Sequence, residues 1–171
     1  KGIDDFVKMA EANPDVQFIW AGGFSFGTIT DGYDHYKQMV DNPPKNLTFA
    51  GIVDRDKLVK YLNIADLFVL PSYDELFPMS VLEAFSCGTP VLLRDLDLYK
   101  AIIDGYYMSG KDFGEMNQIL QKAVKDPQLL KKYSELSKKA SQEYSEERLA
   151  KIWNEFYHEQ YRLGKELGQI H

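Results

Sequence analysis

Short apolar runs alternate along the chain with segments whose apolar residues recur at helical spacing. In residues 3–12, for example, Ile3, Phe6, Val7 and Ala10 share one helical face. The pattern predicts helices over 3–12, 33–41, 54–64, 96–103, 112–124, 127–144 and about 145–167, a short helix between 79 and Gly88, and strands over 16–21, 46–50, 66–70, 90–93 and 106–108. Such alternation predicts an α/β domain with one parallel sheet flanked by helices.

The composition narrows the class of protein. A chain of 171 residues suits one domain with its own core. Its net charge of −6 argues against nucleic acid as a partner, and against this surface being the main contact with an anionic membrane. The single cysteine, Cys87, excludes an internal disulfide and a cysteine metal cage. Since neither a membrane span nor a signal peptide is visible, the cytoplasm is the expected compartment.

Candidate chemistry gathers in the loops that follow the predicted strands, because ligands of parallel α/β sheets bind at the carboxyl ends of strands. These loops are 22–32, 51–54, 71–78 and 94–98. Glu75 lies in the third loop, and Glu83 follows eight positions later inside a short helix. The first N–H groups of that helix can hold a phosphate, and a carboxylate can accept hydrogen bonds from sugar hydroxyls. The pattern therefore indicates a site for a nucleotide-sugar.

Residues 65–91 resemble the E-x7-E signature of the retaining "group 1" glycosyltransferases with the GT-B fold. The strand over 65–72, the glutamate pair, and the run from Leu82-Glu83-Ala84 to Gly88-Thr89-Pro90-Val91 follow the family's order and spacing. The resemblance extends from Lys1-Gly2-Ile3-Asp4 to the last helix. It implies that residues 1–171 form the C-terminal, nucleotide-sugar-binding domain, a Rossmann-like half of a GT-B fold. The N-terminal acceptor domain and the first strand of the sheet would then lie outside the chain.

The resemblance also implies roles for the residues that would hold the nucleotide. Lys1 would neutralise the donor diphosphate, and Glu83 would accept hydrogen bonds from the ribose hydroxyls. The backbone near Ile52 and Val53 would pair with the nucleobase edge, and the Gly22-Gly23 turn would let the backbone approach the ligand. On the residues alone, a solvated lysine, an exposed helical glutamate and plain strand-end turns remain open.

A second group of residues would face the transferred sugar. Glu75 would orient the sugar or stabilise positive charge at its anomeric carbon, although a solvated loop acid beside Asp74 is the alternative. The junction formed by Phe77, Met79, Ser80 and Val81 would present N–H groups to phosphate and sugar oxygens. Leu76 and Pro78 stand where glycines are usual in the family, and Pro78 has no N–H to donate. The identity of the sugar therefore stays open.

No metal or other cofactor is expected. Asp95-Leu96-Asp97 matches a metal-binding pattern of another glycosyltransferase fold, but two carboxylates alone make a poor site. The three histidines are in no metal-ligand spacing. Residues 94–99 resemble the corresponding loop of enzymes that glycosylate membrane lipids, including diacylglycerol glucosyltransferases.

The expected function is transfer of a hexose from a nucleotide diphosphate sugar, with UDP-glucose preferred, to an acceptor of the diacylglycerol glycolipid type, with retention. The full-length protein would be peripheral at the inner face of the membrane, whereas this domain alone would turn over little. Two alternatives remain: a non-catalytic nucleotide-binding or interaction module, and a GT-B-fold sugar-nucleotide epimerase.

Overall fold

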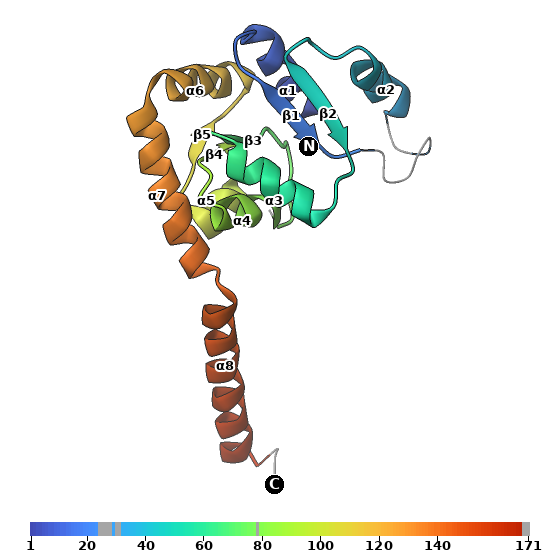
Figure 1. Ribbon diagram of the computed structural model, residues 1–171. Coiled ribbons are helices and arrows are strands. Elements are labelled where there is room, and N and C mark those ends of the chain that lie inside the picture. The colour runs from blue at the N-terminus through green and yellow to red at the C-terminus, as the bar shows by residue number, and fades with distance from the viewer. Residues whose placement is uncertain (24–28, 30–31, 78, 169–171) are drawn as a thin grey trace.

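The computed structural model describes residues 1–23, 29, 32–77 and 79–168 (Figure 1). Every predicted helix and strand is present, with ends within two residues of the predicted ones. In chain order the elements are α1 (Ile3–Ala12), β1 (Phe18–Ala21), α2 (Tyr33–Asp41), β2 (Leu47–Gly51), α3 (Arg55–Ile64), β3 (Phe68–Leu70), α4 (Met79–Ser86), β4 (Val91–Arg94), α5 (Asp97–Ile103), β5 (Met108–Gly110), α6 (Phe113–Lys125), α7 (Pro127–Glu143) and α8 (Glu146–Glu166).

Local capping chemistry explains where several helices begin. The carboxylate of Asp54 accepts the N–H of Lys57 at 2.7 Å, as the sequence predicted for the start of α3. The carboxylate of Asp112 caps α6 in the same way, through the N–H of Glu115 at 2.9 Å. Ser145 caps α8. These caps fix the helix boundaries and hence the lengths of the loops between helices and strands.

All paired strands are parallel, but they form two sheets. β1 pairs with β2, whereas β4 lies between β3 and β5. No backbone pairing among the described residues joins β1 to β3. The parallel α/β class is therefore confirmed, whereas the prediction of one continuous sheet is corrected. The physical reason is that β1 and β3 each use only one edge for hydrogen bonding.

Two clusters of buried side chains hold the domain together. The first joins α1 and α6 to both sheets, through residues such as Phe6, Phe18, Leu92 and Met116. The second lies around α4 and includes Val81, Phe85, Leu93 and Tyr99, all with 0% exposure. Since α4 also contacts α3 and α7, its position relative to the three-stranded sheet is fixed from several sides.

The last helix, α8, extends away from the body of the domain (Figure 1). Its apolar residues keep the helical spacing seen in the sequence, but they stay exposed: Trp153 is 49% exposed, Phe156 46% and Tyr157 63%. The three rings contact one another, with centroids 5.6–5.8 Å apart. None of the described helices combines the length and the apolar character needed to cross a membrane.

Candidate active site

The structure brings Lys1 and Glu75 together. The ammonium of Lys1 donates to both carboxylate oxygens of Glu75, at 2.6 and 2.7 Å. The Glu75 side chain is only 5% exposed, whereas that of Lys1 is 63% exposed. Burial, and then the negative charge of Glu75, raise the pKa of the Tyr99 phenol. The Glu75 carboxylate is therefore nearly buried and paired with a lysine, so it is not a solvated loop acid.

A close approach of two backbones explains how residues so far apart in sequence meet. Gly2 has a φ of 73°, and a Cβ at this position would lie 2.1 Å from the carbonyl oxygen of Pro71. Only glycine fits here, since any side chain would meet the backbone that leaves β3. The carbonyl of Gly2 then accepts the N–H of Phe6 at 3.1 Å and starts α1. The start of α1 is thereby placed against the loop that carries Glu75.

A buried charged network lies beneath this loop, and the sequence did not single it out as part of the site. Arg94, at the end of β4, is 6% exposed and Asp5, in the first turn of α1, is 4% exposed. The Arg94 guanidinium donates to the Asp5 carboxylate at 2.5 Å, and the hydroxyl of Tyr73 donates to the same oxygen at 2.7 Å. That hydrogen bond, together with burial, raises the pKa of Tyr73. The sequence shows an arginine directly after the apolar run 91–93, but nothing in it indicates Asp5 or Tyr73 as partners.

The predicted nucleobase residues lie at the ends of β1 and β2. The N–H of Gly22 donates to the carbonyl of Gly51 at 2.9 Å, and Gly51 has a φ of 69°. A Cβ on Gly23 would lie 3.2 Å from the side chain of Ile52, which is 68% exposed. Val53 follows, half-buried, before the cap of α3. No hydrogen bond or ion pair within the described part of the chain joins this group to Lys1 and Glu75.

The loop that follows β1 is described only in part. Residues 24–28, 30 and 31 of this loop lie outside the described residues.

The junction before α4 agrees with the prediction in part. The N–H of Met79 donates to the carbonyl of Phe77 at 3.0 Å, so it is not free as expected. The N–H groups of Ser80 and Val81 have no acceptor among the described residues. The side chain of Val81 is buried, whereas those of Phe77 and Met79 are 49% and 61% exposed. Pro78, whose missing N–H was noted above, lies outside the described residues.

Glu83 stands one turn further along α4. Its side chain is half-buried, and its carboxylate has no hydrogen bond or ion pair in the part of the chain that the structure describes. Its partly exposed carboxylate can therefore accept hydrogen bonds from water or from a ligand. Unlike Glu75, which is paired with Lys1, Glu83 thus has its carboxylate oxygens available.

The two carboxylates of the Asp95-Leu96-Asp97 segment form ion pairs with Lys100. The ammonium of Lys100 lies 2.8 Å from Asp95, an ion pair without the angle of a directed hydrogen bond, and 3.7 Å from Asp97. Their interaction raises the pKa of Lys100. Across the described residues, no group of three or more histidines, cysteines or acids could hold a metal ion.

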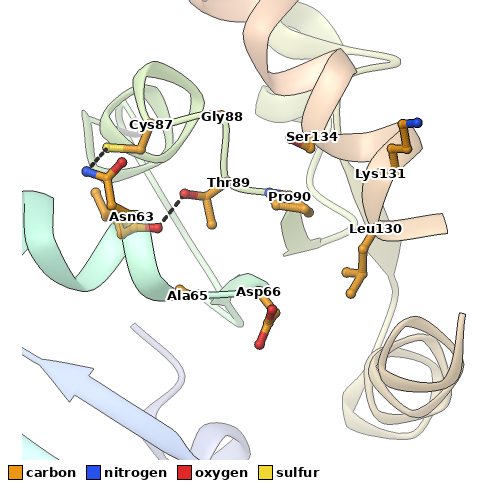
Figure 2. A pocket seen from close by; sticks show the side chains of 11 residues that line it. Asn63, Ala65, Asp66, Cys87, Gly88, Thr89, Pro90, Leu130, Lys131 and Ser134 are labelled. Atoms are coloured by element: carbon orange, nitrogen blue, oxygen red, sulfur yellow. Dashed lines mark hydrogen bonds between the residues drawn. The ribbon is translucent and has the colours of Figure 1, made fainter. Parts of the chain in front are cut away.

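A hollow of about 330 Å³ lies at the amino-terminal ends of β3 and β4 (Figure 2). It is bounded by the ends of α3 and α4, by α7, and by the residues that precede β3 and β4, among them Asp66 and Pro90. Thr89 is held there by a hydrogen bond to the carbonyl of Leu62 at 2.8 Å. None of the predicted site residues lines this hollow, so it is separate from the candidate site.

The fold is that of a Rossmann-like half of a GT-B glycosyltransferase. The structure of a sucrose-phosphate synthase from Thermosynechococcus elongatus matches 95% of this chain and 43% of its own chain, with a TM-score of 0.80 at 22% identity. The sequence model described as "Glycosyl transferases group 1" matches residues 1–143. The chain belongs to this family of glycosyltransferases, as its resemblance to the family predicted.

Two curated relatives are more similar in sequence. An alpha-galactosylglucosyldiacylglycerol synthase of Streptococcus pneumoniae is 53% identical over 165 residues, which are 96% of this chain and 44% of the relative. A processive diacylglycerol alpha-glucosyltransferase of Acholeplasma laidlawii is 32% identical over 131 residues, 75% of this chain and 38% of the relative. The chain thus spans less than half the length of these relatives.

Proposed function

We propose that this chain is the donor-binding domain of a retaining glycosyltransferase that moves a hexose from a UDP-sugar to a diacylglycerol-type glycolipid. The observation that carries the proposal is the Lys1–Glu75 pair. It sets an exposed ammonium and a nearly buried carboxylate beside the beginning of α4, in a chain of the group 1 family. A cation suits a diphosphate, and a fixed carboxylate suits a sugar that becomes positively charged as it is transferred.

Different elements would contact different parts of the nucleotide-sugar donor. Lys1 and the N–H groups of Ser80 and Val81 hold the diphosphate, with Phe77 and Met79 beside it, and Glu83 accepts from the ribose hydroxyls. The ends of β1 and β2, at Gly22, Gly23, Ile52 and Val53, receive the nucleobase. Glu75 faces the sugar. The oxygen of the acceptor hydroxyl bonds to the anomeric carbon while the bond from that carbon to the diphosphate breaks, and the hydroxyl proton goes to the departing diphosphate. Since Lys1 and helix N–H groups meet the leaving charge, the proposal needs no metal.

The sugar and the linkage are proposed from the relatives. The name of the Streptococcus relative includes a galactosyl unit, and that of the Acholeplasma relative describes an alpha-glucosyltransferase. UDP-glucose remains the predicted donor, and UDP-galactose is the second candidate. Both names specify alpha linkages. Because the anomeric bond of either UDP-hexose is also alpha, an alpha product means retention.

The rest of the polypeptide supplies what this chain lacks. We propose that a strand preceding Lys1 fills the space between β1 and β3, because each of these strands has an open edge and Gly2 packs on the residue that follows β3. A further N-terminal domain would carry the acceptor site, in keeping with the length of the relatives. A cytoplasmic protein, peripheral at the membrane, remains the predicted setting, and this domain alone should turn over little.

The test uses the full-length polypeptide with vesicles that contain diacylglycerol or glucosyl-diacylglycerol. Each UDP-hexose is supplied with a radioactive label in the sugar. Labelled glycolipid and an equal amount of free UDP are the expected products. An epimerised UDP-sugar formed without acceptor would favour the epimerase instead. Binding of UDP with no product from any donor would favour a non-catalytic module.

A further inference from the structure

The two segments that carry Lys1 and Glu75 are joined at both ends. At one end the Lys1 ammonium bridges both oxygens of Glu75. At the other end Asp5, on the segment that begins with Lys1, accepts the hydroxyl of Tyr73, two residues before Glu75. The side chains of Asp5 and Tyr73 therefore hold the segments together independently of the Lys1–Glu75 pair.

Arg94 holds this second connection in place. Its Nε donates to the carbonyl of Pro71 at 3.1 Å, one Nη to the carbonyl of Lys111 at 3.1 Å, and the other Nη to Asp5. Its guanidinium also lies 4.1 Å from the centre of the Tyr73 ring. A single buried side chain thus contacts both segments and the turn before α6. We name Asp5, Tyr73 and Arg94 the clamp.

Donor binding, as proposed above, changes the contacts of the Lys1–Glu75 pair. If Lys1 moves to the diphosphate and Glu75 to the sugar, the two segments lose their direct connection at that end. The clamp contains neither residue, and its charges are already paired inside the domain, so it keeps its contacts. Fixed groups catalyse better than mobile ones, because they need no reorganisation during the reaction.

We propose that Arg94, acting through Asp5 and Tyr73, is a positioning residue that keeps Glu75 in place for hexose transfer. This inference rests on the proposed function. The clamp itself, however, is a property of the fold that can be measured without the reaction. Tyr73 offers the mildest probe, because it is 62% exposed and Tyr73→Phe removes only the hydroxyl while the ring remains over Arg94.

The first measurement is of backbone NMR order parameters for residues 72–76 in the full-length polypeptide. Tyr73→Phe should lower them from the rigid range of about 0.85 toward about 0.6. Tyr144→Phe is the matched control, since it also removes a tyrosine hydroxyl that donates a hydrogen bond, in this case to the backbone carbonyl of Ile102, at a place away from the site. It should leave residues 72–76 unchanged. Unchanged order parameters in Tyr73→Phe would overturn the clamp, whether or not the protein transfers hexose.

The second measurement is a double-mutant cycle on kcat at saturating donor. Tyr73→Phe should lower kcat about threefold to tenfold, but by less than about twofold when Glu75 is already alanine, because coupled residues are not additive. Tyr144→Phe should leave kcat unchanged. An equal loss in both backgrounds, or a normal kcat in Tyr73→Phe, would overturn the positioning role. Absence of hexose transfer by the unmodified protein would instead refute the proposed function and leave the order parameters to decide the clamp.

Discussion

Among single residues, Glu75 and Glu83 differ in their surroundings. Glu75 is 5% exposed and paired with Lys1, whereas Glu83 is half-buried without a polar partner among the described residues. A carboxylate that is paired before the ligand arrives must exchange that partner, while an unpaired one can gain hydrogen bonds directly. We therefore expect Glu75 to act mainly during transfer and Glu83 mainly in donor affinity.

Glu83→Gln should weaken UDP binding by the full-length polypeptide by about 1–3 kcal/mol, because the ribose hydroxyls lose a charged acceptor. Isothermal titration would measure this change. Glu135→Gln on α7 is the matched control, since Glu135 is an exposed helical glutamate that forms an ion pair with Lys138. Equal affinity in Glu83→Gln and in the control would remove Glu83 from the ribose role.

The sequence named candidate site residues but not the contacts between them. Lys1 and Glu75 were both named from the family pattern, but their mutual ion pair was not foreseen, because it depends on the contact of Gly2 with Pro71. Arg94 was not recognised, since a single arginine after an apolar run gives no sign of its partners. Backbone groups such as the N–H of Met79 cannot be assigned from residue identity at all.

At the scale of elements, the alternation of helices and strands was predicted well because periodicity and caps are local signals. Asp54, a residue type that commonly caps helices, indicated the start of α3, and in the structure its carboxylate accepts a hydrogen bond from the N–H of Lys57. β1 and β3 each begin two residues later than predicted: the apolar residues Val16 and Leu67 pack on the core although they lie before the paired residues. Apolar character reports burial, whereas a strand needs a hydrogen-bonded neighbour.

The start of α1 gives a prediction at this scale. Gly2→Ala should destabilise the domain by about 1–3 kcal/mol, because a side chain there has a positive φ and meets the Pro71 carbonyl. Gly105→Ala is the control, with a φ of 82° but nothing within 4 Å of the added Cβ. Thermal or denaturant unfolding should show a larger loss in Gly2→Ala. Equal losses would mean that the contact with Pro71 is unimportant.

For the whole molecule, the sequence did not show which apolar faces stay exposed to solvent and which strand edges stay unpaired. The helical spacing of Trp153, Phe156 and Tyr157 predicted an amphipathic helix correctly, but their faces stay exposed in this chain. Likewise, the strands were recognised, yet β1 and β3 do not pair. Both features depend on what lies next to an element in space, and the periodicity of an element does not show which neighbour covers it.

We predict that the aromatic face of α8 is buried in the full-length polypeptide. Trp153→Ala should then destabilise the full-length protein by about 3–5 kcal/mol, as expected for truncation of a buried tryptophan. Val124→Ala on α6, a half-exposed site, is the control and should change stability by less than about 0.5 kcal/mol. Denaturant unfolding would separate the two. A small effect of Trp153→Ala would show that α8 keeps this face in water.

The most direct test of the account is the effect of Glu75→Ala on turnover and on UDP affinity in the full-length polypeptide. Initial rates of hexose transfer are measured at saturating donor, with UDP affinity determined in parallel and Asp74→Ala, the exposed neighbouring acid, as the control. We predict that Glu75→Ala transfers hexose at least about tenfold more slowly, which corresponds to an activation barrier raised by about 1.4 kcal/mol, while its UDP affinity is nearly unchanged. A normal transfer rate in Glu75→Ala would contradict it.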